Sequence, residues 1–135
     1  CVTNVPTNRF AFPTPNTYHP EQWELLRRVF NANRNLTLEH FFKPTSLAPG
    51  APGKFDLNNG GGLSTDMVGG SILWPNASYA ARAHIFDAHR EYTLSLFHFL
   101  RTDPSVGARL QSEIAEWGLC ADEFLDDPIH WPHQL

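Results

Sequence analysis

The spacing of hydrophobic residues along this chain of 135 residues predicts three helices. The first covers about 20–32, because Trp23, Leu26 and Phe30 recur at the spacing of one helix face. Pro20 suits its first turn, where a missing N–H costs nothing. We expect this helix to end in the asparagine-rich segment that follows.

The longest predicted helix covers about 77–102 and is apolar on two faces. One face carries Tyr79, Ala83, Phe86, Thr93, Phe97 and Leu100, and the other carries Ile85, Tyr92, Leu96 and Phe99. A helix that is apolar on more than one side is covered on more than one side. The sequence offers two further helices as cover, so we expect structure from outside this chain to complete it.

The third predicted helix covers about 104–117. Its apolar positions follow spacings of four, four and three: Val106, Leu110, Ile114 and Trp117. Asp103 can cap its start, and Pro104 occupies its first turn. Gly118 is a natural stop.

The remaining segments predict a few short strands. Phe10 and Phe12 alternate as an edge strand, and Thr37–Lys43 is expected to pair with Lys54–Asn58 across a turn at 49–53. Seven of the nine glycines lie between 43 and 75, a stretch without helical or strand period. We therefore predict one segment, 1–135, with an α+β fold that is mainly helical: three helices, a small hairpin and a long Gly/Pro-rich loop.

Composition narrows the class of protein. A hydrophobic content of 41% with 18% charged residues is typical of a soluble globular chain. A net charge of -4 with scattered basic residues argues against a nucleic-acid partner, and no apolar run reaches the roughly 18 residues of a membrane span. The chain begins with Cys1 and not Met, so we expect a processed product or a piece of a longer polypeptide.

The two cysteines and two sequons leave localisation unknown, with secretion as one option. Cys1 and Cys120 form no C-x-x-C unit, which excludes a zinc or redox motif of that type. They can pair only if their α-carbons come within about 7 Å, so paired and free states are both open. Asn35 and Asn76 each start an N-x-S/T sequon, and Asn76 also sits where a helix cap is wanted.

Candidate chemistry is sparse when the residues are taken alone. His84 and His89 are five apart, about 140° around a helix, so they do not form a metal pair, and we predict no metal site. His89, Arg90 and Glu91 form either a salt-bridged network or the wall of a site. Ser64, Thr65 and Asp66 form either a self-capped turn or a reactive group. A metal hydrolase that uses the histidines is a further alternative.

A series of short motifs runs through nearly the whole chain. The motifs, in order, are Thr3-Asn4-Val5-Pro6-Thr7-Asn8-Arg9, Lys54-x-Asp56-x-Asn58-Asn59, Ser64-Thr65-Asp66, Trp74-Pro75-Asn76-Ala77-x-Tyr79-Ala80-x-Arg82, His89-Arg90-x-Tyr92, Phe99-Leu100-x-x-Asp103-Pro104, Trp117-Gly118-Leu119-Cys120-x-Asp122-Glu123-Phe124 and Trp131-Pro132-His133-Gln134-Leu135. Their order resembles the middle portion of the FAD-dependent oxidoreductase family. Residues 1–34 resemble its fungal branch most.

The resemblance implies a substrate-side segment inserted between parts of an FAD-binding domain. FAD would supply the hydride chemistry, and protein groups would orient a small organic substrate, with a carbohydrate-like molecule as one option. The G-x-G-x-x-G phosphate-binding turn is absent from this sequence. We therefore expect the fragment alone to be inactive, and the remainder of the parent polypeptide to be its main partner.

The resemblance also implies roles for individual residues. Cofactor contacts are expected from Asn58, Asn59, Ser64 and Asp66; substrate contacts from Lys54, Asp56, Arg90 and His130; and catalysis from His89 and His133. A buried polar network that braces the loop is the competing role for the same residues. The rival function is a self-contained secreted binding module without catalytic activity.

Overall fold

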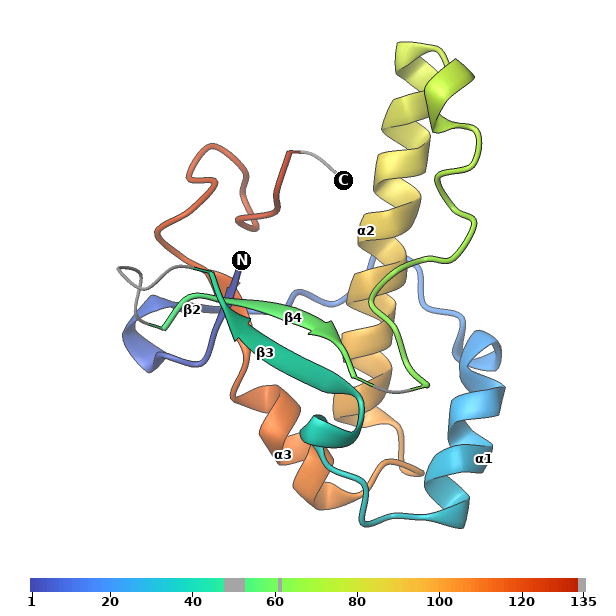
Figure 1. Ribbon diagram of the computed structural model, residues 1–135, viewed down its shortest axis with the longest axis vertical. Coiled ribbons are helices and arrows are strands. Elements are labelled where there is room, and N and C mark those ends of the chain that lie inside the picture. Colours follow the sequence, from blue (N-terminus) through green and yellow to red (C-terminus); the bar gives the residue numbers. More distant parts are fainter. Residues whose placement is uncertain (48–52, 61, 134–135) are drawn as a thin grey trace.

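The computed structural model describes residues 1–47, 53–60 and 62–133. Its elements, in chain order, are β1 (Val2–Thr3), β2 (Arg9–Ala11), α1 (Glu24–Ala32), β3 (Phe42–Ser46), β4 (Phe55–Asn59), α2 (Tyr79–Thr102), α3 (Ala108–Ala115) and β5 (Gly118–Cys120). Short 3-10 helices cover Pro6–Asn8, Pro20–Trp23, Leu38–His40 and Trp74–Asn76. In Figure 1, α2 stands upright beside the sheet, with α1 and α3 around its lower end.

The prediction of a mainly helical fold is wrong. The fold is a mixed α+β arrangement, with 43% of residues helical, 13% in strands and a five-stranded antiparallel sheet. Three of the strands are only two or three residues long. A strand this short has no room to display an alternating pattern, so only its pairing in the folded chain defines it.

The sheet has the order β2-β5-β1-β4-β3 and joins segments from both ends of the chain. β5 lies between β1 and β2, with Leu119 opposite Val2 on one side and Phe10 on the other. β2 is an edge strand, as the alternation of Phe10 and Phe12 predicts. Gly118 belongs to β5 and does not stop the preceding helix. A Cβ at this glycine would collide with the Phe10 carbonyl oxygen, so the close strand approach requires glycine there.

A disulfide between Cys1 and Cys120 closes this arrangement. Their α-carbons lie 6.0 Å apart, within the reach of a disulfide. The bond links β5 to the residue just before β1, across a sequence separation of 119 residues. In the chain-entropy model, a disulfide that closes a loop of this length lowers the entropy of the unfolded chain and thereby stabilises the fold by about 4–5 kcal/mol.

The helices begin later than the sequence predicts. Pro20–Trp23 is 3-10, and α1 starts at Glu24. Ser78, not Asn76, caps α2, because its side chain accepts the N–H of Ala81. α3 starts at Ala108 because residues 103–106 form a turn, in which the Val106 N–H donates to the Asp103 carbonyl oxygen, and the extended Gly107 follows as the N-cap.

The predicted hairpin is present with a shifted first strand. β3 starts at Phe42 because Leu38–His40 forms a 3-10 turn, held by hydrogen bonds between Thr37 and His40. Pro44 is tolerated because β3 is the outer strand of the sheet. The turn expected at 49–53 lies mostly in residues 48–52, which are outside the described residues.

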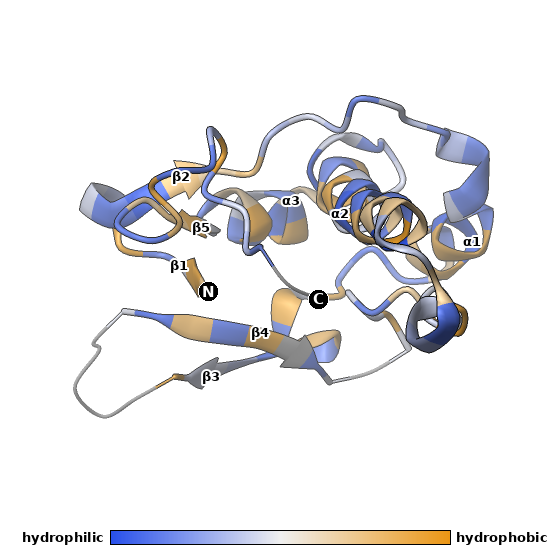
Figure 2. Ribbon diagram, turned by 90° about the horizontal axis from the view of Figure 1, so that it is seen from above, coloured by the Kyte–Doolittle hydropathy of each residue, from blue (hydrophilic) through white to orange (hydrophobic). Residues whose placement is uncertain are grey.

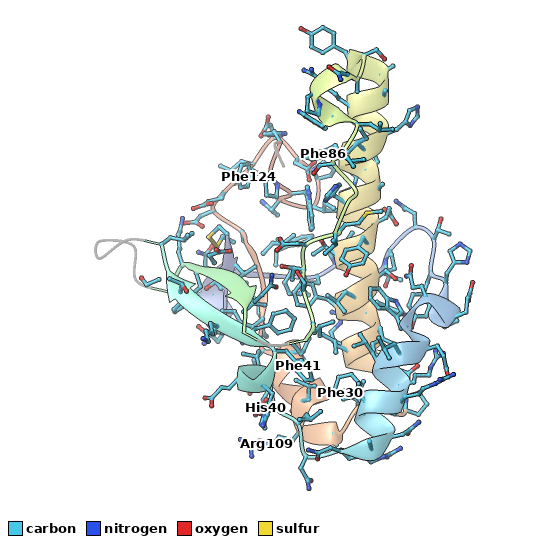
Figure 3. All side chains as sticks on the ribbon, turned by 45° about the vertical axis from the view of Figure 1, so that its right-hand side comes forward. Phe30, His40, Phe41, Phe86, Arg109 and Phe124 are labelled. Atoms are coloured by element: carbon cyan, nitrogen blue, oxygen red, sulfur yellow. A yellow bond between two sulfur atoms is a disulfide. The ribbon has the colours of Figure 1, made fainter. Side chains whose placement is uncertain are left out.

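The hydrophobic core lies between the sheet, α1, α3 and the C-terminal half of α2. Phe12 stacks on Phe97 with ring centroids 4.2 Å apart, and Phe30 meets Phe41 at 5.5 Å. Seen from above, α2 lies between α1 and the strands β1, β2 and β5 (Figure 2). Figure 3 places Phe30 and Phe41 at the lower end of the molecule and Phe86 on the half of α2 that rises above it.

Candidate functional site

A cavity of about 510 Å³ lies against the middle of α2. Three segments form its walls: residues 65–71, the α2 turn that carries His89, Arg90 and Thr93, and the pair Trp131–Pro132. We name residues 62–73 the strap and residues 121–133 the C-terminal segment. In Figure 1 the strap runs along one side of α2 and the C-terminal segment lies above the sheet.

Hydrogen bonds tie the strap to α2. The Tyr92 hydroxyl donates to the Ser64 carbonyl oxygen at 3.1 Å, and the Thr93 hydroxyl lies 3.4 Å from the Thr65 carbonyl oxygen. Burial, and then the negative charge of Asp66, raise the pKa of Tyr92, so this hydroxyl stays protonated as a donor. The strap therefore holds a fixed position over the helix.

Asp66 is positioned by its neighbours in the strap and in β4. Its N–H donates to the Ser64 hydroxyl at 2.8 Å, which is the self-capped turn that the sequence suggests. One carboxylate oxygen accepts from the Asn59 side-chain amide at 2.8 Å, and the Asn59 side-chain oxygen accepts from the Thr65 N–H at 3.3 Å. These contacts join three residues predicted for the cofactor, Asn59, Ser64 and Asp66, in one network. The side chain of Asn58 lies outside the described residues.

His89 has a polar atom with no assigned partner. Its Nε2 is buried and has no hydrogen-bond partner among the described residues. The strap passes directly over it, because a Cβ added at Gly70 would lie 2.7 Å from this atom. A buried polar atom without a partner costs about 1–3 kcal/mol. Among the described residues, His98 Nδ1 and Arg101 Nε are in the same condition, but of the three residues only His89 lines the cavity.

Arg90 braces the opposite wall. Its guanidinium lies 2.9 Å from an Asp87 carboxylate oxygen. Burial opposes the ionisation of Asp127, but the N–H groups of Trp131 and Ile129 and the charge of Arg90 outweigh it and hold the pKa of Asp127 below its ordinary value. The ionised Asp127 fixes the backbone of Trp131 by a 3.0 Å hydrogen bond. The two hydrogen bonds to Asp127 thereby hold the segment that brings Trp131 to the cavity.

Four other predicted site residues lie elsewhere. Lys54 pairs with Glu123 at 2.7 Å and with Asp122 at 2.9 Å, and these hydrogen bonds raise the pKa of its ammonium. Lys54 therefore anchors the C-terminal segment to the hairpin. Asp56 lines a smaller neighbouring cavity of about 140 Å³.

His130 and His133 flank the cavity wall in sequence but do not line the cavity. The His130 Nδ1 lies 2.9 Å from the Glu123 carbonyl oxygen, and its ring packs on Phe10. His133 is exposed and lies 3.0 Å from an Asp126 carboxylate oxygen. Asp66, His89 and Arg90 thus line the same cavity. His130 and His133 contact other residues, outside the cavity lining.

Sequence reasoning missed Thr93, Gly70 and Trp131 as site residues. Thr93 reads as part of an apolar helix face, and Trp131 reads as a tail residue that needs burial. Gly70 carried a signal, because adjacent glycines outside a regular element mark places where another group approaches the backbone closely.

The donor set of this cavity fits a small hydrogen-bonding molecule and not a whole FAD. The charged groups of Asp66 and Arg90 already hold Asn59 and Asp87. Pyrophosphate is commonly held by a glycine-rich turn that opens a helix, and none of the described lining residues forms one. The described lining residues therefore offer no pyrophosphate site of this common type.

A metal site and a membrane-spanning helix are both absent from the part of the chain that the structure describes. No three or more His, Cys, Asp or Glu side chains converge there in a way that could hold a metal ion. Within the same residues, each helix is too short or too polar to cross a membrane.

Comparison with known proteins does not identify a family for this chain. The chain matches no protein-family model, no curated protein and no solved structure.

Proposed function

We propose that this chain is the substrate-side segment of an FAD-dependent oxidoreductase, and that the cavity against α2 receives its small organic substrate. One observation carries the proposal. Asp66, His89 and Arg90 stand in two separate motifs of the family resemblance, and they line one cavity with a buried, unpartnered imidazole nitrogen. Perturbed or unpaired polar groups in a concave site are the usual marks of function.

The side chains have distinct roles in this proposal. His89 exchanges a proton with the substrate, because imidazole is suited to proton transfer near neutral pH. Asp66 accepts a hydrogen bond from the substrate and is held for that task by Asn59 and Ser64. Arg90 is a positioning residue in the cavity lining, held by its ion pair with Asp87. FAD, bound by other parts of the parent polypeptide, supplies the hydride chemistry.

Exposed apolar residues near the cavity support the proposal that this chain is part of a larger polypeptide. Val68, Ile72, Leu73 and Tyr79 are 93%, 79%, 71% and 89% exposed. They lie in the strap and at the start of α2, next to the proposed site. Exposed apolar surface of this kind marks an interaction site, and the partner proposed here is the remainder of the parent polypeptide.

The test uses the parent polypeptide purified with its natural cofactor. We expect a yellow protein with the absorbance bands of bound flavin. His89→Leu should keep the flavin and lower kcat by about 10²–10⁴-fold, which is the usual contribution of a general acid or base. His84→Leu is the matched control, because His84 is an exposed residue of the same helix and should leave kcat unchanged. A colourless parent protein would refute the proposal.

The second candidate, a secreted binding module, has its own support. The Cys1–Cys120 disulfide is typical of an oxidising compartment, and Asn35 of the first sequon is exposed. Phe97 and Phe99 are fully covered within the chain. A monomer that unfolds cooperatively and does not bind ANS, a dye of exposed apolar surface, would favour the secreted binding module. Aggregation through the exposed apolar residues would favour the substrate-side segment of a larger flavoprotein.

A further inference from the structure

The candidate site continues into a second, smaller cavity. This inner cavity measures about 140 Å³ and shares four lining residues with the larger one, Thr65, Thr93, Trp131 and Pro132. A molecule that occupies the outer cavity can therefore extend into the inner one. Two hydroxyl-bearing residues, Thr65 and Thr93, lie at the junction.

The inner cavity is lined mainly by apolar side chains of the core. Phe12, Leu57 and Phe97 lie on its wall, and each is more than nine-tenths buried. Val2 and Leu119, from strands β1 and β5, add to the apolar lining, and Asp56, which is exposed, adds a carboxylate. An engineered and wholly apolar cavity of about 150 Å³ holds one benzene molecule. The inner cavity is therefore about the size of one aromatic ring.

In the outer cavity, Arg90 is paired with Asp87 at 2.9 Å, whereas the Asp66 carboxylate accepts from the neutral side-chain amide of Asn59. Among the described lining residues, the charge left without an opposite charge is therefore the negative charge of Asp66. A carboxylate or phosphate would need a free cation, which Arg90 does not provide. A neutral hydroxyl can both donate and accept, and it suits Asp66, His89 and the two threonines.

We propose that the ligand of this site is an alcohol with an apolar end of about one aromatic ring, an arylalkanol in chemical class. This inference rests on the proposed function, since it takes the same cavity as the substrate site. The ring enters the inner cavity beside Phe12 and Phe97, and the hydroxyl lies near Thr93 and His89. A carbohydrate fits poorly, because each hydroxyl buried without a partner in the inner cavity would cost about 1–3 kcal/mol.

The experiment uses the 135-residue chain and three probes, 2-phenylethanol, toluene and glycerol, followed by two-dimensional NMR. We expect 2-phenylethanol to shift the signals of Thr65, Thr93 and Leu57, with a Kd at least about tenfold below that of glycerol, because only the former buries a ring. Toluene should shift Leu57 but leave the outer cavity unaffected. Intermolecular NOEs from the ring protons to Phe12 and Phe97 should place the ring directly.

Leu57→Phe fills the inner cavity and should raise the Kd of 2-phenylethanol at least about tenfold. Leu47→Phe, the same change at an exposed position in the adjoining hairpin, is the control and should leave it unchanged. Equal affinity for glycerol, shifts confined to other surfaces, or no binding would each overturn the inference. If Leu57→Phe does not fold, the NOEs on the natural chain decide alone. None of these outcomes depends on the flavin absorbance of the parent protein. A failure of the ligand inference can therefore be told apart from a failure of the proposed function.

Discussion

The two halves of α2 have similar apolar content and opposite environments. From Leu94 to Leu100 the side chains are buried, apart from His98, whereas none from Tyr79 to Glu91 is. Trp23 and Phe30 pack on Phe99 in the lower half, and Phe12 stacks on Phe97. In the upper half, Arg82 donates to the Trp74 carbonyl oxygen just before the helix, and Glu91 accepts from Asn16. An apolar face therefore predicts that cover is needed, but it does not say which segment provides it.

This difference separates a half of α2 that lies in the core from a half that carries most of the candidate site. The lower half holds the aromatic stack and ends at the partly buried Arg27–Asp103 ion pair, whose nitrogen and oxygen lie 2.9 Å apart. The upper half contributes His89 and Arg90 to the cavity and lies next to the exposed patch, whereas unpartnered buried nitrogens occur in both halves, at His89 in the upper and at His98 and Arg101 in the lower. Stability and function should respond to different substitutions along one helix.

The largest effect is expected from Phe97→Ala in the lower half. Phe97 is 2% exposed and stacks on Phe12, so its removal leaves a cavity and should cost about 3–5 kcal/mol of the free energy of unfolding. Urea denaturation measures this. Tyr79→Ala, which removes an aromatic ring from the upper half of the same helix, should change the free energy by less than about 0.5 kcal/mol. Equal losses of unfolding free energy in the two variants would contradict the difference between the two halves of α2.

A smaller effect should follow from Asp103→Asn, which weakens the ion pair below α2. Burial raises the pKa of Asp103, but hydrogen bonds from Ser105 and the charge of Arg27 outweigh it and hold that pKa below the ordinary 3.8. The ionised carboxylate therefore stabilises the fold above that value, and the stabilisation is lost as the pH falls through the lower, folded-state pKa. We expect a loss of about 1–3 kcal/mol at neutral pH.

The pH dependence provides the control for this variant. In urea titrations, the stability of the natural chain should fall more steeply below pH 3.8 than that of Asp103→Asn. Parallel curves would show that Asp103 contributes nothing through its charge.

Gly70→Ala should act on the upper half with little change in global stability. The added methyl group meets His89 Nε2 at 2.7 Å, so the strap must lift away from α2. We expect faster hydrogen exchange in the strap and a loss of free energy of unfolding of at most about 1 kcal/mol. Gly62→Ala, where an added Cβ meets nothing within 4 Å, is the control. Unchanged exchange in Gly70→Ala would show that the strap does not rest on His89.

The smallest stability effect is expected from Ile72→Ser combined with Tyr79→Ser. Both side chains are exposed, so the free energy of unfolding should change by less than about 0.5 kcal/mol. The association of the chain with itself at high concentration should decrease, which light scattering measures. Unchanged association would mean that the patch is not adhesive.

Local patterns in the sequence predicted the elements whose signals are local. The stripe of Trp23, Leu26 and Phe30 gave the first helix, and the Gly/Pro-rich connection between apolar runs gave the hairpin of β3 and β4. β1 and β5 were missed because two or three residues carry no period. Gly118 was predicted to end a helix because its real constraint is not local. A Cβ at this position would collide with the carbonyl oxygen of Phe10 on the neighbouring strand.

The candidate site shows the same limit. The motif order pointed to Asp66, His89 and Arg90, which line the cavity, and equally to His130 and His133, which do not. The positive φ of 57° at His130 helps to turn the chain there, so its ring packs on Phe10.

By itself, the sequence determined the approximate positions of the three helices and which of their faces are apolar, because both depend on neighbours within a few residues. The tertiary structure decided which half of α2 is covered, that Cys1 meets Cys120, and which polar groups share a cavity. These depend on what lies opposite a residue in space, which is set by the packing of segments up to 119 residues apart.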